Sequence, residues 1–186
     1  MTTETSAAAD LATTQVHRVY IRTTPDRIWA AITSPEWTQR YGYTGVVDSS
    51  WTPGAPYLVH PSASFKAAAE AGGFPCPDPI VDGEVEVAEP PHRLITTWRM
   101  LMDPNTSQEP FTRLTHEIKE LPGGYCSLTV VHECPGAPAT QAMLRGVDED
   151  MGAGGGWDWV LSDLKSLIET GEPMVRWAPG QEPTPV

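Results

Sequence analysis

GGGWDWVLSDLKSLIETGEP, residues 154–173, is the stretch that decides the fold, because it holds the clearest amphipathic helix of the chain. Apolar side chains recur there at the spacing i, i+3, i+4, i+7, i+10 and i+11, which is typical of one helix face. The residues on this face are Trp157, Val160, Leu161, Leu164, Leu167 and Ile168. The opposite, polar face is expected to carry Asp158, Ser162, Asp163, Lys165, Ser166 and Glu169. Gly171 fits the C-terminal cap and Pro173 the end of the helix.

A run of glycines stands directly before this helix, next to the large side chain of Trp157. Glycine lets a helix bend or approach a sheet closely. One interpretation is that the glycines leave room at one end of a cavity, where Trp157 forms part of the wall. The other is a glycine-rich loop with Trp157 in the core. Upstream, the spacing of Met143, Leu144, Val147 and Met151 is consistent with an earlier turn of the same helix. Residues 152–156 would then be a weak point within it.

Composition narrows the class of protein. The 186 residues suit one domain. The formal net charge of −12 argues against nucleic acid or insertion into an anionic membrane as partners, since both need a basic face. No apolar run is long enough to span a membrane. The odd number of cysteines, in no CxxC spacing, indicates reduced thiols and a cytoplasmic location; these are Cys76, Cys126 and Cys134.

The rest of the chain is mostly strand. His17, Val19 and Ile21 alternate with polar residues, which predicts a first strand over residues 16–23. Pro25 and Pro35 each follow a capping-type residue, which predicts two short helices. Further strands are expected within residues 43–51, 55–61, 81–89 and 93–100, and in a hairpin over 111–133 with its turn at residues 123–124.

This order predicts an α+β fold. Strands joined by short turns make a bent antiparallel sheet, here of about six to seven strands, around one long C-terminal helix. The two short helices follow the first strand. The space between sheet and helix is where a binding site is expected. We expect a disordered tail at residues 1–15, one domain at 16–172 and a proline-rich tail at 173–186.

Four motifs follow one another along the chain: TPDRIWAAITSPEWTQRY (24–41), DGEVEVAEPPHRLITTW (82–98), GGYCSLTVVHE (123–133) and GWDWVLSDLKSLIETG (156–171). In this order they resemble the START-like (SRPBCC) superfamily, which has the helix-grip fold. Within it, the chain is similar to the family named for homologues of the activator of the heat-shock-protein ATPase. The chain departs from the family pattern at residues 61–80, a longer insertion with a short helix expected at 64–71 and a hinge at 72–73. It is either a lid over the site or a surface loop.

His116 and His132 are the candidate catalytic residues, because each lies on the apolar face of its expected strand. A neutral imidazole there can orient a carbonyl or hydroxyl group or move a proton. The alternative, which the pattern favours, is that both are hydrogen-bonded core histidines. His17 is a weaker candidate. The candidate ligand-binding residues are Trp98, Met100, Leu114, His116, Val130, His132, Met151, Trp157 and Leu161.

No cofactor or metal is expected. Cys126 is six residues before His132, and no third ligand is spaced to complete a metal site with the two histidines. The chain has no G-x-S-x-G motif of a serine hydrolase. It also has no P-loop and no G-x-G-x-x-G after a predicted strand, the two glycine motifs that bind phosphate.

The resemblance implies a protein that binds a small hydrophobic molecule in the cavity. Three alternatives stay open. The first is a polyketide cyclase or aromatase-type enzyme, with His116 or His132 as acid or base. The second is a resistance protein that sequesters a natural product of the enediyne type. The third is a chaperone-interaction module, as the family name suggests. A buried polar pair in the cavity favours the enzyme, and an all-apolar lining favours carriage.

Overall fold

The computed structural model describes residues 13–146, 155–176 and 184–185. In chain order its strands and helices are β1 (Thr14–Ile21), α2 (Pro25–Thr33), α3 (Pro35–Thr38), β2 (Gly45–Asp48), β3 (Pro56–Pro61), α4 (Ala63–Gly72), β4 (Val81–Glu89), β5 (Arg93–Met100), α5 (Pro104–Ser107), β6 (Thr112–Leu121), β7 (Tyr125–Glu133), α6 (Pro138–Leu144), α7 (Gly156–Thr170), β8 (Val175–Arg176) and β9 (Thr184–Pro185). β1 begins two residues before the expected domain boundary, and β8 lies within the expected tail.

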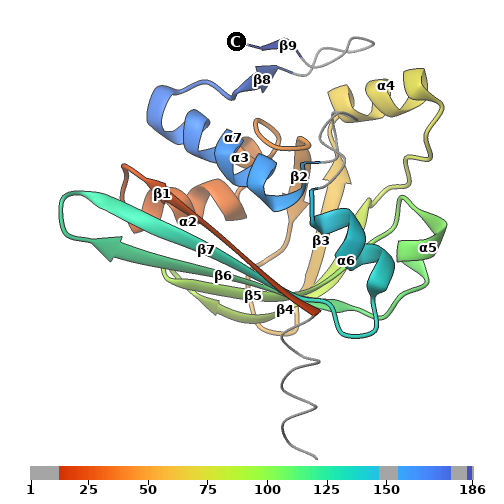
Figure 1. Ribbon diagram of the computed structural model, residues 1–186, viewed down its shortest axis with the longest axis horizontal. Helices are drawn as coiled ribbons and strands as arrows, with labels where there is room; N and C mark the ends of the chain where they lie inside the picture. The colour runs from red at the N-terminus through yellow and green to blue at the C-terminus, as the bar shows by residue number, and fades with distance from the viewer. Residues whose placement is uncertain (1–12, 147–154, 177–183, 186) are drawn as a thin grey trace, which may run out of the picture.

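Seven strands form one antiparallel sheet in the order β1-β7-β6-β5-β4-β3-β2. The sheet is curled, and α7 lies across its concave side (Figure 1). The two short helices, α2 and α3, follow β1 as expected. The predicted α+β helix-grip fold is therefore confirmed, with the sheet at the upper end of the expected strand number.

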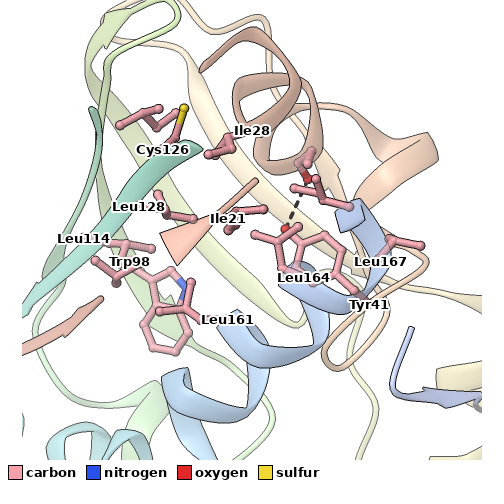
Figure 2. Close-up of a cluster of buried hydrophobic side chains, with 14 of the residues drawn as sticks. Ile21, Ile28, Tyr41, Trp98, Leu114, Cys126, Leu128, Leu161, Leu164 and Leu167 are labelled. Atoms are coloured by element: carbon pink, nitrogen blue, oxygen red, sulfur yellow. Dashed lines mark hydrogen bonds between the residues drawn. The ribbon is translucent and has the colours of Figure 1, made fainter. Parts of the chain in front are cut away.

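The core lies between the apolar stripe of α7 and the concave face of the sheet. Leu161, Leu164 and Leu167 are 4%, 1% and 0% exposed. They share one buried cluster with Ile28 from α2 and with apolar residues of the sheet, among them Ile21, Trp98, Leu114 and Leu128 (Figure 2). Truncating one such leucine to alanine typically costs about 2–5 kcal/mol, so this interface holds the domain together.

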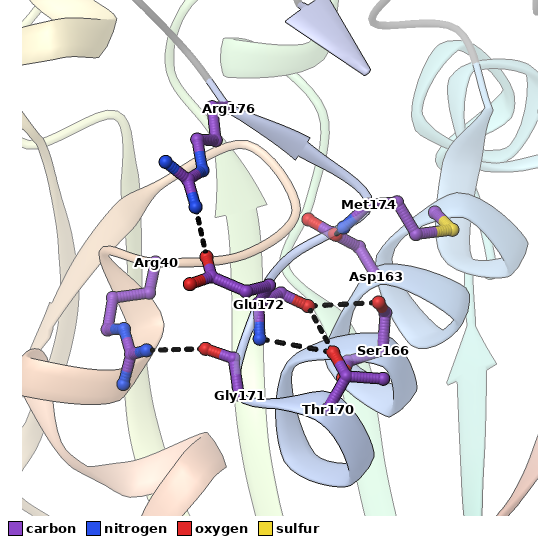
Figure 3. A network of polar contacts seen from close by, with 8 residues as sticks. All are labelled: Arg40, Asp163, Ser166, Thr170, Gly171, Glu172, Met174 and Arg176. Carbon is purple, nitrogen blue, oxygen red and sulfur yellow. Dashed lines mark hydrogen bonds and ion pairs between the residues drawn. The ribbon is translucent and has the colours of Figure 1, made fainter. Parts of the chain in front are cut away.

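Asp163 corrects the expected pattern of α7, because it is 0% exposed and not on a solvated face. Its carboxylate accepts hydrogen bonds from the backbone N–H of Gly42 (2.7 Å) and of Met174. Burial raises the pKa of this carboxyl group. Nearby, Arg40 donates to the carbonyl of Gly171 at 3.1 Å (Figure 3). These contacts tie the loop after α3 and the segment after α7 to the helix.

The expected early turn of the C-terminal helix is a separate helix, α6, which contains Met143 and Leu144 and packs on α7. Val147 and Met151 lie outside the described residues. Gly146 and Gly156 have φ of +66° and +57°, and a Cβ on Gly156 would overlap the carbonyl oxygen of Leu144. Glycine is therefore needed here so that two backbone segments can touch. A side chain at Gly155 would meet Trp159 and one at Gly156 would meet the backbone of Leu144, so these two glycines serve close contact.

The insertion contains the expected short helix, α4. Ser62 caps it by accepting a hydrogen bond from the N–H of Phe65 at 3.1 Å. Asp78, at the end of the insertion, binds His60 Nδ1 of β3 at 2.5 Å and Lys66 Nζ of α4 at 2.8 Å. The insertion is thus fastened to β3 by the contact between the partly exposed side chains of Asp78 and His60.

At Gly83 the backbone of β4 lies so close to β5 that there is no space for a side chain. A Cβ at Gly83 would overlap the backbone carbonyl of Thr97 on β5. We predict that Gly83→Ala lowers the free energy of unfolding by about 1–3 kcal/mol, because the strands must separate. Urea denaturation measures this change. The matched control is Glu84→Ala at the next, exposed position, which should change stability by less than about 0.5 kcal/mol. Equal effects of the two substitutions would contradict the close-approach argument.

Candidate functional site

The predicted site residues that the structure describes meet on the concave face of the sheet, beside the N-terminal end of α7, where Trp157 lies. In the sheet register, Leu114 lies opposite His132, and His116 lies opposite Val130. All four are buried, as are Trp98 and Leu161. Met100 and Trp157 are partly buried against the same cluster. Met151 lies outside the described residues, so its predicted role has no structural counterpart here.

His132 is fully buried and hydrogen-bonded at both ring nitrogens. Trp157 Nε1 donates to His132 Nδ1 at 3.1 Å, and His132 Nε2 lies 2.8 Å from Thr112 Oγ1. The Thr112 hydroxyl in turn donates to the backbone carbonyl of Trp98 at 2.8 Å. Indole N–H is a donor only, so Nδ1 must be the acceptor and Nε2 must carry the proton. The network therefore fixes His132 as one neutral tautomer.

Two pairs of rings in the site pack edge to face. The His132 and Trp98 ring centroids are 5.2 Å apart at 87°, and those of His116 and Trp157 are 5.8 Å apart at 83°. Burial, with a smaller contribution from the charges of His116 and His17, lowers the pKa of His132 to about 3. His132 is thus a neutral structural acceptor that fixes the indole of Trp157.

His116 differs from His132 although it is nearly as buried. It is 8% exposed, and its Nδ1 atom is buried without a hydrogen-bond partner among the described residues. Burial lowers the pKa of His116 to about 4, so the ring is neutral at pH 7. Buried polar atoms are nearly always paired, and an unpaired one in a fold-defining position requires an explanation.

Thr96 is a second such position, and the sequence reasoning missed it. It is 1% exposed, and its Oγ1 atom is also buried without a partner in the described part of the chain. Leu94 pairs with His116 and Thr96 pairs with Leu114, so Thr96 is a diagonal neighbour of His116. The alternation of Leu94, Thr96 and Trp98 along β5 was the available signal, because it places all three on the inward face. Thr112 was missed in the same way.

His17 lies on β1 near the start of α7. Its Nδ1 donates to Asp158 Oδ1 at 2.8 Å, and its Nε2 lies 3.4 Å from Gln15 Oε1. The Asp158 side chain is 79% exposed, so this pair lies at the solvent boundary. Of the three histidines on the concave face, His116 is therefore the one with an unpaired, buried nitrogen.

Two hollows lie away from these histidines. One of about 450 Å³ lies between the insertion and the segment after β5, and it is lined by Pro75, Cys76, Pro77, Leu101, Met102, Pro104, Ser107 and Gln108. The other, about 220 Å³, lies at the edge of β1 and is lined by Tyr20, Ile21, Arg22, Gly123, Tyr125, Lys165 and Glu169. Neither contains a site residue expected from the sequence.

The described residues contain no group of three or more His, Cys, Asp or Glu side chains that is placed to hold a metal ion. Within the same part of the chain, no helix is long and apolar enough to cross a membrane. Cys126 and Cys134 are buried free thiols, and Cys76 is a partly buried one.

Comparison with known proteins supports the fold. CalU16 from Micromonospora echinospora is 18% identical, with a TM-score of 0.58 over 86% of this chain and 76% of that chain. DynU16, a putative protein in the dynemicin biosynthetic locus, is 22% identical, with a TM-score of 0.58 over 87% of this chain but only 49% of that chain. The Aha1 dimer from Colwellia psychrerythraea is 14% identical, with a TM-score of 0.55 over 85% and 97%. At these identities the likeness shows a shared fold alone.

No curated protein matches the chain. A family model described as Activator of Hsp90 ATPase homolog 1-like protein matches residues 22–169, from the end of β1 to the last turn of α7. This span includes every strand of the large sheet except β1, and nearly all of the helix that covers the sheet. The chain therefore belongs to the Activator of Hsp90 ATPase homolog 1-like family, within the START-like superfamily.

Proposed function

We propose that this protein binds a small, largely apolar molecule between the concave sheet and α7. The observation that carries the proposal is His116, whose buried Nδ1 has no partner among the described residues. Leaving a buried polar atom unpaired costs about 1–3 kcal/mol, and a ligand that bonds to it recovers that free energy. Around it, apolar contact with the ligand comes from Trp98, Leu114, Val130 and Leu161.

Access to His116 depends on Trp157 in this proposal. The indole packs edge-on against the imidazole of His116 and is itself only partly buried. Its one hydrogen bond in the site is to His132 Nδ1. Rotation of Trp157 away from this acceptor uncovers His116 without any change in the sheet. Met100, also partly buried, is a flexible side chain that adapts to the shape of a ligand.

A second candidate function is an enzyme, and the same observation favours it. A neutral, unpaired His116 offers a lone pair to a bound substrate at pH 7, but its pKa of about 4 makes it a weak base. His132 has no such capacity while its nitrogens are bonded to Trp157 and Thr112. His116 is therefore the one candidate acid–base residue in the enzyme hypothesis. Incubation of the protein with a bound molecule distinguishes the two functions, because an enzyme changes the molecule chemically and a carrier does not.

Natural-product sequestration and chaperone binding have weaker support. Sequestration of an enediyne-type natural product rests on likeness of fold to CalU16 and DynU16. A chaperone partner rests on the family description. A cytoplasmic location rests on the free thiols, and a lid function for residues 61–80 rests on the helix they contain. We retain each as a hypothesis below the binding function.

Binding is tested with N-phenyl-1-naphthylamine, an uncharged apolar probe whose fluorescence rises in apolar sites. We predict that Trp157→Arg weakens binding at least tenfold, because a guanidinium replaces the movable wall of the site. The matched control is Val16→Arg, which places the same group on an exposed position of β1 and leaves binding unchanged. Native mass spectrometry of the freshly purified protein provides an independent readout of any molecule retained. Absence of probe binding to the wild-type protein, or equal binding by both variants, would reject the proposal.

The two buried histidines predict a pH dependence of stability. Their pKa values in the folded protein, about 4 for His116 and about 3 for His132, lie below the ordinary value of 6.5. Between pH 6.5 and 5 the unfolded state therefore binds more protons than the folded state, so stability falls as the pH falls. The slope approaches two protons, roughly 2.7 kcal/mol per pH unit.

His116→Leu should reduce this slope by about one proton. Urea denaturation at a series of pH values measures it. The control is His92→Asn at an exposed position after β4, which should leave the slope unchanged. An unaltered slope in His116→Leu would mean that His116 is protonated in the folded protein.

A further inference from the structure

The unpaired polar atoms of the concave face form a pair on adjacent strands. His116 Nδ1 on β6 and Thr96 Oγ1 on β5 are both buried without partners in the described part of the chain. Diagonal neighbours on one face of an antiparallel pair are about 7–8 Å apart at most, within reach of one ligand group placed between their side chains. A single polar group therefore has two atoms to bond.

The neighbouring polar side chains are already committed. His132 and Thr112 are bonded within the Trp157–His132–Thr112 network. His17 is bonded to Asp158 at the solvent boundary. On the concave strands, the polar locus that a ligand beneath α7 meets is therefore formed by His116 and Thr96. Rotation of Trp157 also frees His132 Nδ1, and Tyr43 Oη and Trp159 Nε1, on the loop before β2 and on α7, are two further buried atoms without a partner in the described part of the chain.

Within the residues that the structure describes, the locus has no charged side chain that could pair with an ionised group of a ligand. His116 is neutral at pH 7, and no Lys or Arg is buried among the described residues. The one buried carboxylate in that part of the chain, Asp163, is bonded to the backbone of Gly42 and Met174. A carboxylate or ammonium group at the locus would be buried without a counter-ion, at a large desolvation cost.

A hydroxyl group fits the locus better than a carbonyl group. A hydroxyl both donates and accepts, so it pairs with Thr96 and with either neutral tautomer of His116. A carbonyl accepts only, and it requires the proton of His116 to be on Nδ1. An ether also lacks the donor. Resting on the proposed function, we infer that the ligand is an uncharged molecule whose hydroxyl group is bonded between His116 and Thr96.

Three probes of one shape test this inference: 2-naphthol, 2-methoxynaphthalene and 2-naphthoate, each used to displace N-phenyl-1-naphthylamine. We expect 2-naphthol to bind wild-type protein about tenfold more tightly than the methyl ether, as two neutral hydrogen bonds allow. The naphthoate anion should bind more weakly than 2-naphthol. Equal affinities of 2-naphthol and its methyl ether, or tighter binding of the anion, would overturn the inference.

Thr96→Val tests the second contact, because it replaces the hydroxyl with a methyl group of similar size. The preference for 2-naphthol over its methyl ether should fall to about threefold or less. Thr115→Val, on the opposite face of β6 beside His116, is the matched control and should keep the tenfold preference. If N-phenyl-1-naphthylamine binds and no preference for 2-naphthol over its methyl ether is found, the proposed ligand class is wrong and the binding function stands. If N-phenyl-1-naphthylamine does not bind, the binding function itself fails.

Discussion

The packing of α7 across the concave sheet is the constraint on which the rest of the structure depends. Its apolar stripe supplies the inner half of the core, and its polar residues close the edge of the sheet. Lys165 Nζ donates to the carbonyl of Tyr20, and the N–H of Arg22 donates to Glu169 Oε1. Exposed edge strands are prone to pair with other chains, and these two contacts occupy backbone groups at the end of β1. One helix therefore covers the sheet face and engages the end of its edge strand.

The periodicity of the sequence was enough to predict the strands of the large sheet and the apolar face of α7. Period two and period 3.6 are local properties, and they placed Leu161 and His132 correctly on buried faces. Asp163 was misplaced because its partners are 121 and 11 residues away, at Gly42 and Met174. No helical pattern contains that information. The separation of α6 from α7 failed for the same reason, since it depends on contact between the backbones at Gly146 and Gly156.

The candidate site was predictable as a face but not as a set of bonds. The sequence places His116 and His132 together and gives no reason to treat them differently. Only their neighbours distinguish them: His132 is bonded to Trp157 and Thr112, and His116 Nδ1 has no partner in the described residues. Thr96 was overlooked because an inward threonine usually bonds to a nearby backbone carbonyl, as Thr112 does.

The two histidines show how equal burial leads to opposite consequences. The bonds of His132 offset its desolvation and hold Trp157 in one orientation. His116 has no such compensation at Nδ1, and an unpaired buried atom costs about 1–3 kcal/mol out of a typical total stability of about 5–15 kcal/mol. A leucine at this position would pack the same face without that cost. The folded domain itself therefore gives no reason for polarity at His116 and Thr96, which is why we propose that a ligand bonds there, and the shared fold alone would not have pointed to either residue.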